Sequence, residues 1–200
     1  MIQRTALAAV FVSGLIVCTI FDQDLWRWLK AAESVGERDW YRLLRIAGYL
    51  PTWVVAAGVV IGASGGRLIR RGIALAGSAA VAGLMAEILK LVIARSRPGE
   101  DGQYHYRGLF SGFVDGSNLG MPSSHAAVAF GAAFAASRLF PGAGYVLVPV
   151  AAGCGLTRLL MGAHFTSDVW VAAWVGYLAA RVCVPSSVRT RAWSAARLPA

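Results

Sequence analysis

The sequence predicts an all-α integral membrane protein, a bundle of six transmembrane helices with both termini in the cytoplasm. Of its 200 residues 57% are hydrophobic and 14% are charged, and the mean hydropathy is +0.58. Such a chain is too apolar for an ordinary soluble domain and too short for two domains. Six apolar runs alternate with short polar or arginine-rich segments. We therefore expect a single membrane domain over residues 1–200, with its core at 73–184.

Charge and cysteine placement support a membrane protein over other classes. The net charge of +9 comes almost wholly from arginines at the ends of the apolar runs, which fits membrane topology better than nucleic-acid binding. Cys18, Cys154 and Cys183 each lie inside an apolar run, so they are expected to be small buried hydrophobes rather than disulfide partners or metal ligands. We expect no metal and no cofactor.

The first apolar run extends from Thr5 to Phe21 and is just long enough to cross a bilayer. No small-residue cleavage site follows it, so it is interpreted as an uncleaved first helix. Residues 22–48 are the most polar part of the chain, and their tryptophans and leucines recur at roughly helical spacing. This segment is expected to lie along the membrane interface with its charges on a solvated face.

Two further spans are predicted before the central loop. The second covers Tyr49 to Ala63, and the arginine-rich turn after it, residues 64–72, is expected to face the cytoplasm. The third runs from Ile73 to about Ala94 and carries Glu87 and Lys90 near its outer end. Ionisable groups at that depth are expensive unless they are paired or functional. Glu87 is interpreted as the i,i+3 helical partner of Lys90.

The central loop, Gly99 to Gly120, is interpreted either as a lid or recognition loop or as disordered surface. His105 within it is expected to be plain surface. The last three spans are predicted at residues 121–140, 143–156 and 167–184, followed by a basic cytoplasmic tail at 185–200. Pro122, Ser123 and Ser124 suit a helix start, where free backbone N–H groups attract an anion.

The stretch from Thr157 to Asp168 brings a guanidinium, an imidazole and a carboxylate together between two apolar runs. If the chain is helical from about His164, the i,i+4 spacing places Asp168 beside that ring, which makes His164 a candidate base or nucleophile. Arg158 provides a planar fork suited to phosphate oxygens. From this stretch alone, an Arg158–Asp168 ion pair with a bystander histidine is an equally good explanation.

Six spans with both termini inside would place the polar residues of several spans together on the outer face. These residues are Lys90, Arg97, His125, Arg158, His164 and Asp168. Three permanent cations and two histidines against one or two carboxylates would repel one another in a partly desolvated pocket unless an anion completed it. The sequence therefore predicts a phosphate site at the outer surface of the membrane.

Three stretches carry a family signature. They are Lys90-(six residues)-Arg97-Pro98, Pro122-Ser123-Ser124-His125 and Thr157-Arg158-(five residues)-His164-(three residues)-Asp168. In this order they resemble the motifs of the type 2 phosphatidic acid phosphatase superfamily, which includes bacterial membrane lipid phosphatases and shares its active site with vanadium haloperoxidases. Two positions depart from that pattern, because Ser124 stands where the family usually has Gly and Thr157 where it has Ser.

The resemblance implies a metal-independent mechanism. His164 would attack phosphorus to give a phosphohistidine, Asp168 would orient its ring, and His125 would protonate the leaving oxygen. The phosphate oxygens would be held by Lys90, Arg97, Arg158, Ser123 and a backbone N–H near Ser124. The implied function is hydrolysis of a phosphate or diphosphate on an envelope lipid in the inner or plasma membrane.

Other functions stay open. A lipid phosphotransferase would differ only in its acceptor, a haloperoxidase would hold vanadate with the same residues, and a transporter or scaffold would not need both histidines. The candidate substrates are undecaprenyl diphosphate, phosphatidylglycerophosphate, phosphatidate and the phosphates of lipid A. The outward-facing site and the small chain favour a polyprenyl diphosphate or a related envelope lipid.

Overall fold

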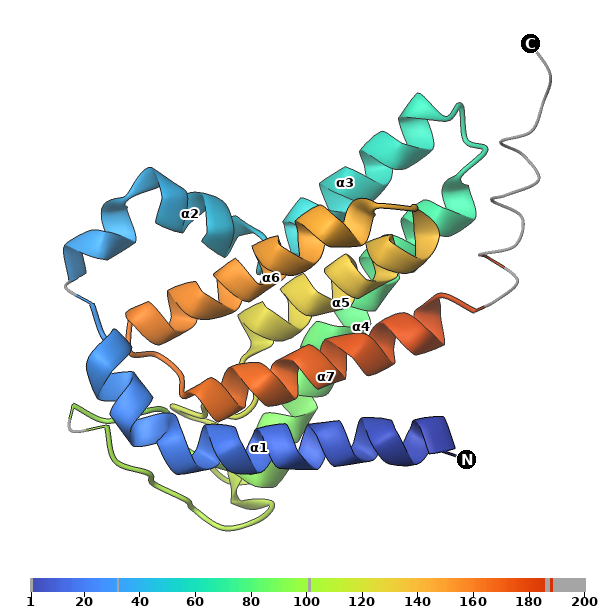
Figure 1. The fold of residues 1–200 in the computed structure, drawn as a ribbon. Helices are drawn as coiled ribbons and strands as arrows, with labels where there is room; N and C mark the ends of the chain where they lie inside the picture. The colour runs from blue at the N-terminus through green and yellow to red at the C-terminus, as the bar shows by residue number, and fades with distance from the viewer. Residues whose placement is uncertain (1, 32, 101, 186–187, 189–200) are drawn as a thin grey trace.

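The computed structural model describes residues 2–31, 33–100, 102–185 and 188, and the prediction of an all-α protein is confirmed over them. Within these residues, β pairing is limited to two isolated β-bridges. The helices, shown in Figure 1, are α1 (Ile2–Leu29), α2 (Asp39–Ile46), α3 (Leu50–Ala63), α4 (Ile69–Ile93), α5 (Ser124–Leu139), α6 (Ala143–Leu160) and α7 (Thr166–Cys183), with short 3-10 turns η1 at Glu33–Glu37 and η2 at Ser111–Phe113.

The first helix is longer than the first apolar run, because residues 22–29 continue α1 instead of lying along the interface. Its last turns are fixed by Trp26, which is 6% exposed and donates its indole N–H to the carbonyl of Gly162 at 3.0 Å. The predicted interfacial segment is thus reduced to η1 and α2. The expectation of a solvated charged face is wrong at Asp22, which is fully buried inside the protein.

Helix α5 forms the centre of the bundle and packs against α4, α6 and α7. Eleven of its 16 residues are buried, and most of these are alanines. Small residues bring the backbones together, since a Cβ added to Gly176 of α7 would lie 2.6 Å from the amide nitrogen of Gly131 in α5. Close approach through glycine and alanine is the packing mode of membrane helices.

Length and composition identify three described helices able to cross a membrane, Thr5–Leu29, Ile69–Ile93 and Ala143–Leu160. The pair α2 and α3, bent by 70°, gives a fourth if it is counted as one broken span. Helix α5 has 16 residues, a length of about 24 Å against a hydrocarbon core of about 30 Å. The six-span arrangement and the side on which each terminus lies stay predictions, and residues 189–200 of the predicted basic tail lie outside the described residues.

The loop between α4 and α5 is paired with the chain on both sides of residues 95–97. On one side, the amide of Ser96 donates to the carbonyl of His105 at 2.9 Å. On the other side, the amide of Arg97 donates to the carbonyl of Asn118 at 2.9 Å. Near the turn η2, the amide of Phe110 donates to the last turn of α4 at Val92. The loop therefore has a defined path beside the site, and the side chain of His105 is exposed as expected.

Candidate active site

Four helix ends bring the predicted site residues to one end of the bundle. These are the carboxyl ends of α4 and α6 and the amino ends of α5 and α7, seen at the left and lower left of Figure 1. The ends are tied directly, since the amide of Ser123 before α5 donates to the carbonyl of Asp168 in α7 at 3.2 Å. The topology thus gathers three stretches that are distant in the sequence.

Lys90 lies in the last turn of α4 and is 8% exposed. Its ammonium donates to Glu87 Oε1 at 2.9 Å, which confirms the helical pair expected from the sequence. Its other contact is the hydroxyl of Ser124, which in turn donates to the same oxygen of Glu87. Ser124, expected at the phosphate, is therefore engaged through its side chain with the lysine and the glutamate.

Several buried polar atoms of the predicted site have no hydrogen-bond partner within the described residues. They are Ser123 Oγ, His125 Nε2, Arg158 Nε and His164 Nδ1. Buried polar groups in native proteins are nearly always hydrogen-bonded. Arg45 and Arg95 each have an unpartnered Nε as well, so the informative feature is the gathering of Ser123 Oγ, His125 Nε2 and Arg158 Nε at one end of the bundle. The four residues belong to two of the three motif stretches, 122–125 and 157–168, and their hydroxyl, imidazole and guanidinium groups can all donate to a phosphate.

His164 lies outside the helix that the i,i+4 reasoning assumed, because α7 begins at Thr166 with Phe165 as its N-cap. Even so, Nδ1 of His164 lies 3.4 Å from Oδ2 of Asp168, although the alignment falls short of a hydrogen bond. The same Oδ2 accepts the amide of Phe165 at 2.8 Å. Asp168 is fully buried, so its carboxylate is fixed beside the ring that it was expected to orient.

Both histidines lie in the field of nearby cations, and His164 also lies beside the carboxylate of Asp168. Arg158, Arg45 and Lys90 act on His125, while Arg158 and Arg97 act on His164. Burial lowers the pKa of His164 below its ordinary value, and the Asp168 carboxylate works in the opposite direction. A lowered pKa keeps the imidazole neutral near pH 7, the form able to act as a nucleophile.

Arg97 is held by the hydrogen bond of its backbone amide to Asn118 and by one side-chain contact, in which Nε donates to the carbonyl of Leu119 at 3.3 Å.

The hydroxyl of Thr157 donates to the carbonyl of Cys154 at 2.6 Å, and Thr157 is fully buried. The Thr157 hydroxyl is therefore bonded back to the carbonyl one turn earlier in α6. His125 is half-buried, with the ring of Tyr49 edge-on at 5.1 Å and the backbone of Gly48 against its side chain.

Two charged residues at the site were missed by the sequence reasoning. Arg95, 7% exposed, donates to Asp168 Oδ1 and to Ser167 Oγ. Asp22 from α1 accepts from the amide of Ser167 at 2.8 Å and from the hydroxyl of Tyr104 at 2.6 Å. The only hint in the sequence was that Arg95 stands two residues before Arg97, while nothing local distinguished Asp22 from a residue at the end of an apolar run.

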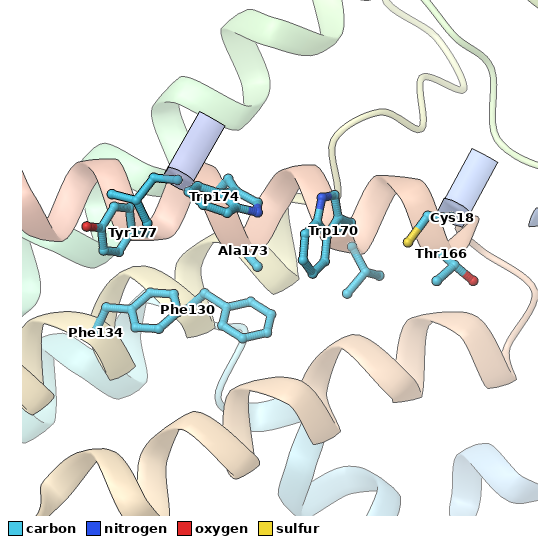
Figure 2. Close-up of a pocket in the computed structure, with 10 residues that line it drawn as sticks. Cys18, Phe130, Phe134, Thr166, Trp170, Ala173, Trp174 and Tyr177 are labelled. Atoms are coloured by element: carbon cyan, nitrogen blue, oxygen red, sulfur yellow. The ribbon is translucent and has the colours of Figure 1, made fainter. Parts of the chain in front are cut away.

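An apolar pocket of about 390 Å³ lies between α1, α5 and α7, and Figure 2 shows the aromatic side chains that line it. It is lined by Leu7, Cys18, Phe130, Phe134, Thr166, Val169, Trp170, Ala173, Trp174 and Tyr177. None of the predicted site residues belongs to it. Asp168 is two residues from both Thr166 and Trp170, so about 100° per residue turns it to the opposite face of α7. The predicted site residues and this pocket are therefore distinct.

Comparisons with known proteins agree with the motifs. A family model described as the PAP2 superfamily matches residues 71–191, a range that contains all eight predicted site residues. The lipid A 1-phosphatase of Rhizobium johnstonii is 38% identical over 110 residues, covering 50% of this chain and 43% of that protein. The lipid A 1-phosphatase of Rhizobium etli is 40% identical over 93 residues, covering 44% and 38%. The match thus spans less than half the length of either relative, and no solved structure matches.

Proposed function

Because the chain belongs to the PAP2 superfamily, we propose that it is a membrane lipid phosphatase that hydrolyses a phosphate ester through a phosphohistidine. The observation that carries the proposal is the set of unpartnered buried polar atoms on Ser123, His125, Arg158 and His164. A tetrahedral phosphate would offer oxygens to Ser123, His125 and Arg158, whereas Nδ1 of His164 faces Asp168 and leaves Nε2 for the phosphorus. The surrounding cations, including Lys90 and Arg97, would balance its charge.

In the first step, Nε2 of His164 attacks phosphorus and the bond from phosphorus to the leaving oxygen breaks. His125 gives its proton to that oxygen, so the leaving alcohol departs neutral. In the second step, water attacks the phosphohistidine, the phosphorus–nitrogen bond breaks, and His125 takes the proton from the water. Asp168 stabilises the positive charge on the imidazole of His164 between the two steps.

Arg158, Lys90 and Arg97 are proposed to hold the equatorial oxygens, where charge grows in the transition state. Ser123 adds its hydroxyl at the start of α5, where the free N–H groups of the helix end also attract an anion. The hydroxyl of Ser124 is already shared between Lys90 and Glu87. Its contribution to phosphate binding is therefore proposed to be its backbone N–H.

Both curated relatives are named lipid A 1-phosphatase, which supports a phosphate of lipid A as the first candidate in the proposed list of substrates. Undecaprenyl diphosphate, phosphatidylglycerophosphate and phosphatidate follow it. The site is proposed to face outward from the inner or plasma membrane, as a six-span arrangement with cytoplasmic termini requires. A lipid phosphotransferase uses the same residues and differs only in replacing water by a second lipid.

The deciding experiment is phosphate release by the full chain purified in detergent, measured across these four lipids with a chelator present. We expect metal-independent release that is absent from His164→Ala and retained by His105→Ala, which changes an exposed loop histidine. Transfer of labelled phosphate to a second lipid without release would identify a transferase. Absence of both activities from the wild-type chain would overturn the proposal.

A further inference from the structure

We propose that Asp22 and Arg95 are positioning residues of this phosphatase, which hold Asp168 and the first turn of α7 in the arrangement that His164 needs. The inference rests on the proposed function. It adds to the site a carboxylate from α1, a helix that lies outside the residues matched by the family model. Neither residue belongs to the phosphate-binding set described above.

Asp22 caps α7 from a distant part of the chain. The first turn of a helix has free N–H groups, and Phe165 at the N-cap carries no side-chain acceptor. The amide of Ser167 instead donates to Asp22 Oδ1 at 2.8 Å, and the hydroxyl of Ser167 donates to Oδ2. A negative charge at this end of a helix is stabilising as well. Helix α1 therefore fixes where α7 begins.

Arg95 joins the two carboxylates. Its Nη2 donates to Asp168 Oδ1 and to Ser167 Oγ, and its Nη1 lies 3.7 Å from Asp22 Oδ2. The guanidinium also lies against the rings of Tyr104 and Phe165, at 5.1 and 5.2 Å from their centroids. A guanidinium that is hydrogen-bonded through its edge and lies against two aromatic rings has little freedom to move. Arg95 thus fixes one oxygen of Asp168 while the other faces His164.

The charge balance of this cluster suits the reaction. Asp22 and Asp168 are two carboxylates and Arg95 is one guanidinium, so the cluster carries a net negative charge. Tyr104, which donates to Asp22, adds no charge. Arg158 and Arg97 act on His164 from the phosphate side. The cluster therefore opposes the phosphate-side cations and stabilises the positively charged imidazole of the intermediate. Loss of one carboxylate should disfavour the charged ring.

The test compares Asp22→Asn with Asp24→Asn in the full chain. Asp24 is two residues further along the same helix and forms an exposed ion pair with Arg27 at 3.6 Å. We expect Asp22→Asn to lower kcat by about 10- to 100-fold, the size of loss that is typical when a residue supporting a functional side chain is mutated. The KM and the inhibition by inorganic phosphate should stay unchanged, because the phosphate-binding cations are intact. Asp24→Asn should behave as wild type.

Nitrogen-15 NMR of the labelled chain gives a readout that does not need turnover. The sequence has only three histidines, so variants at His105 and His125 assign the signal of His164. In Asp22→Asn this signal should titrate at a lower pH than in wild type, while Asp24→Asn leaves it in place. Arg95→Lys provides a second variant, since lysine keeps the charge but not the fork; it should lower kcat as well.

Wild-type kcat in Asp22→Asn would overturn the inference, and so would equal losses in the two asparagine variants. A fall in kcat that matches a loss of folded protein in thermal melting, together with lost phosphate inhibition, would make the cluster merely structural. If the wild-type chain releases no phosphate, the proposed function fails by itself. In that case an unshifted His164 signal in Asp22→Asn would overturn the positioning role, and a shifted one would support it.

Discussion

Lys90 and Ser124 are hydrogen-bonded to each other across the interface between α4 and α5. Both side chains also contact Oε1 of Glu87. The lysine that the mechanism assigns to phosphate is thus shared with a hydroxyl and a carboxylate of the chain itself. Ser124 is one of the two positions at which the sequence departs from the motif pattern that it resembles.

Replacing Ser124 by glycine should strengthen phosphate binding. Without the hydroxyl, one bond of the Lys90 ammonium becomes available to the substrate, and a hydrogen bond of this kind contributes about 1 kcal/mol, or about fivefold in affinity. We expect Ser124→Gly to lower the KM and the inhibition constant of inorganic phosphate by about that factor. Ser117→Gly in the exposed loop is the control. A raised KM would show instead that Ser124 itself binds the substrate.

His164→Ala and His125→Ala should both abolish turnover while the protein still folds. The first removes the nucleophile, and the second removes the proton donor to the leaving oxygen. Phosphate release should fall by at least about 10³-fold in each. Acid-quenched labelling with a radioactive lipid phosphate should give a phosphoprotein in wild type and none in His164→Ala. Labelled His164→Ala would place the covalent intermediate on another residue.

Arg158→Lys should raise the KM without destroying the fold. Lysine keeps the positive charge but offers a single ammonium in place of a planar fork, so it loses bidentate contact with the phosphate. We expect an increase in KM of about tenfold, corresponding to about 1.4 kcal/mol. Arg107→Lys is the matched control, because Arg107 pairs with Asp115 in the exposed loop at 2.8 Å. Equal effects in the two variants would contradict a phosphate role for Arg158.

The acid limb of kcat/KM should lie below the ordinary histidine value of about 6.5. Burial lowers the pKa of His164, and the neutral ring is the nucleophile, so the free enzyme keeps its reactive form to a lower pH than an exposed histidine would. The measurement is a pH profile of phosphate release in detergent at subsaturating lipid. An acid limb above 6.5 would mean that Asp168 outweighs burial.

Gly176→Ala should destabilise the bundle. An added Cβ would lie 2.6 Å from the amide nitrogen of Gly131, so the backbones of α5 and α7 must separate, at a cost of about 1 to 3 kcal/mol. Gly58→Ala in α3 is the matched control, because nothing lies within 4 Å of the added Cβ there. The melting temperature in detergent should fall for the first variant alone.

The helical class could be predicted from the sequence because apolar runs are local signals, and the proposed site residues were selected from motif spacing, which is local as well. Apolar runs locate α3 to α7 to within a few residues, and motif spacing singles out His125, His164 and Asp168. The ring of His164 still meets Asp168, although the residue precedes α7 and the helical argument for the pair was wrong. Here the turn before α7 supplies the contact that the helix was expected to supply.

The buried cluster behind Asp168 could not be predicted in the same way. Arg95 reaches Asp168 over 73 residues and Asp22 reaches Ser167 over 145, so the packing of both α4 and α1 against α7 is needed to bring them together. A charge after an apolar run usually marks the membrane boundary, and this general rule assigned Asp22 to a solvated face. The rule fails because α1 continues past Asp22 and Trp26 anchors its end to Gly162.

The cap that α1 provides for α7 also sets an order of events during biosynthesis. Asp22 is synthesised long before Ser167. Until Ser167 is made, the carboxylate of Asp22 lacks the hydrogen bonds that the amide and hydroxyl of Ser167 donate to it in the folded protein. In a chain interrupted before residue 167, Asp22 has Tyr104 and Arg95 as partners, but the amide and hydroxyl of Ser167 are still missing. The contact that joins α1 to the start of α7 can therefore form only after Ser167 has been synthesised, and the support behind Asp168 is completed at the same moment.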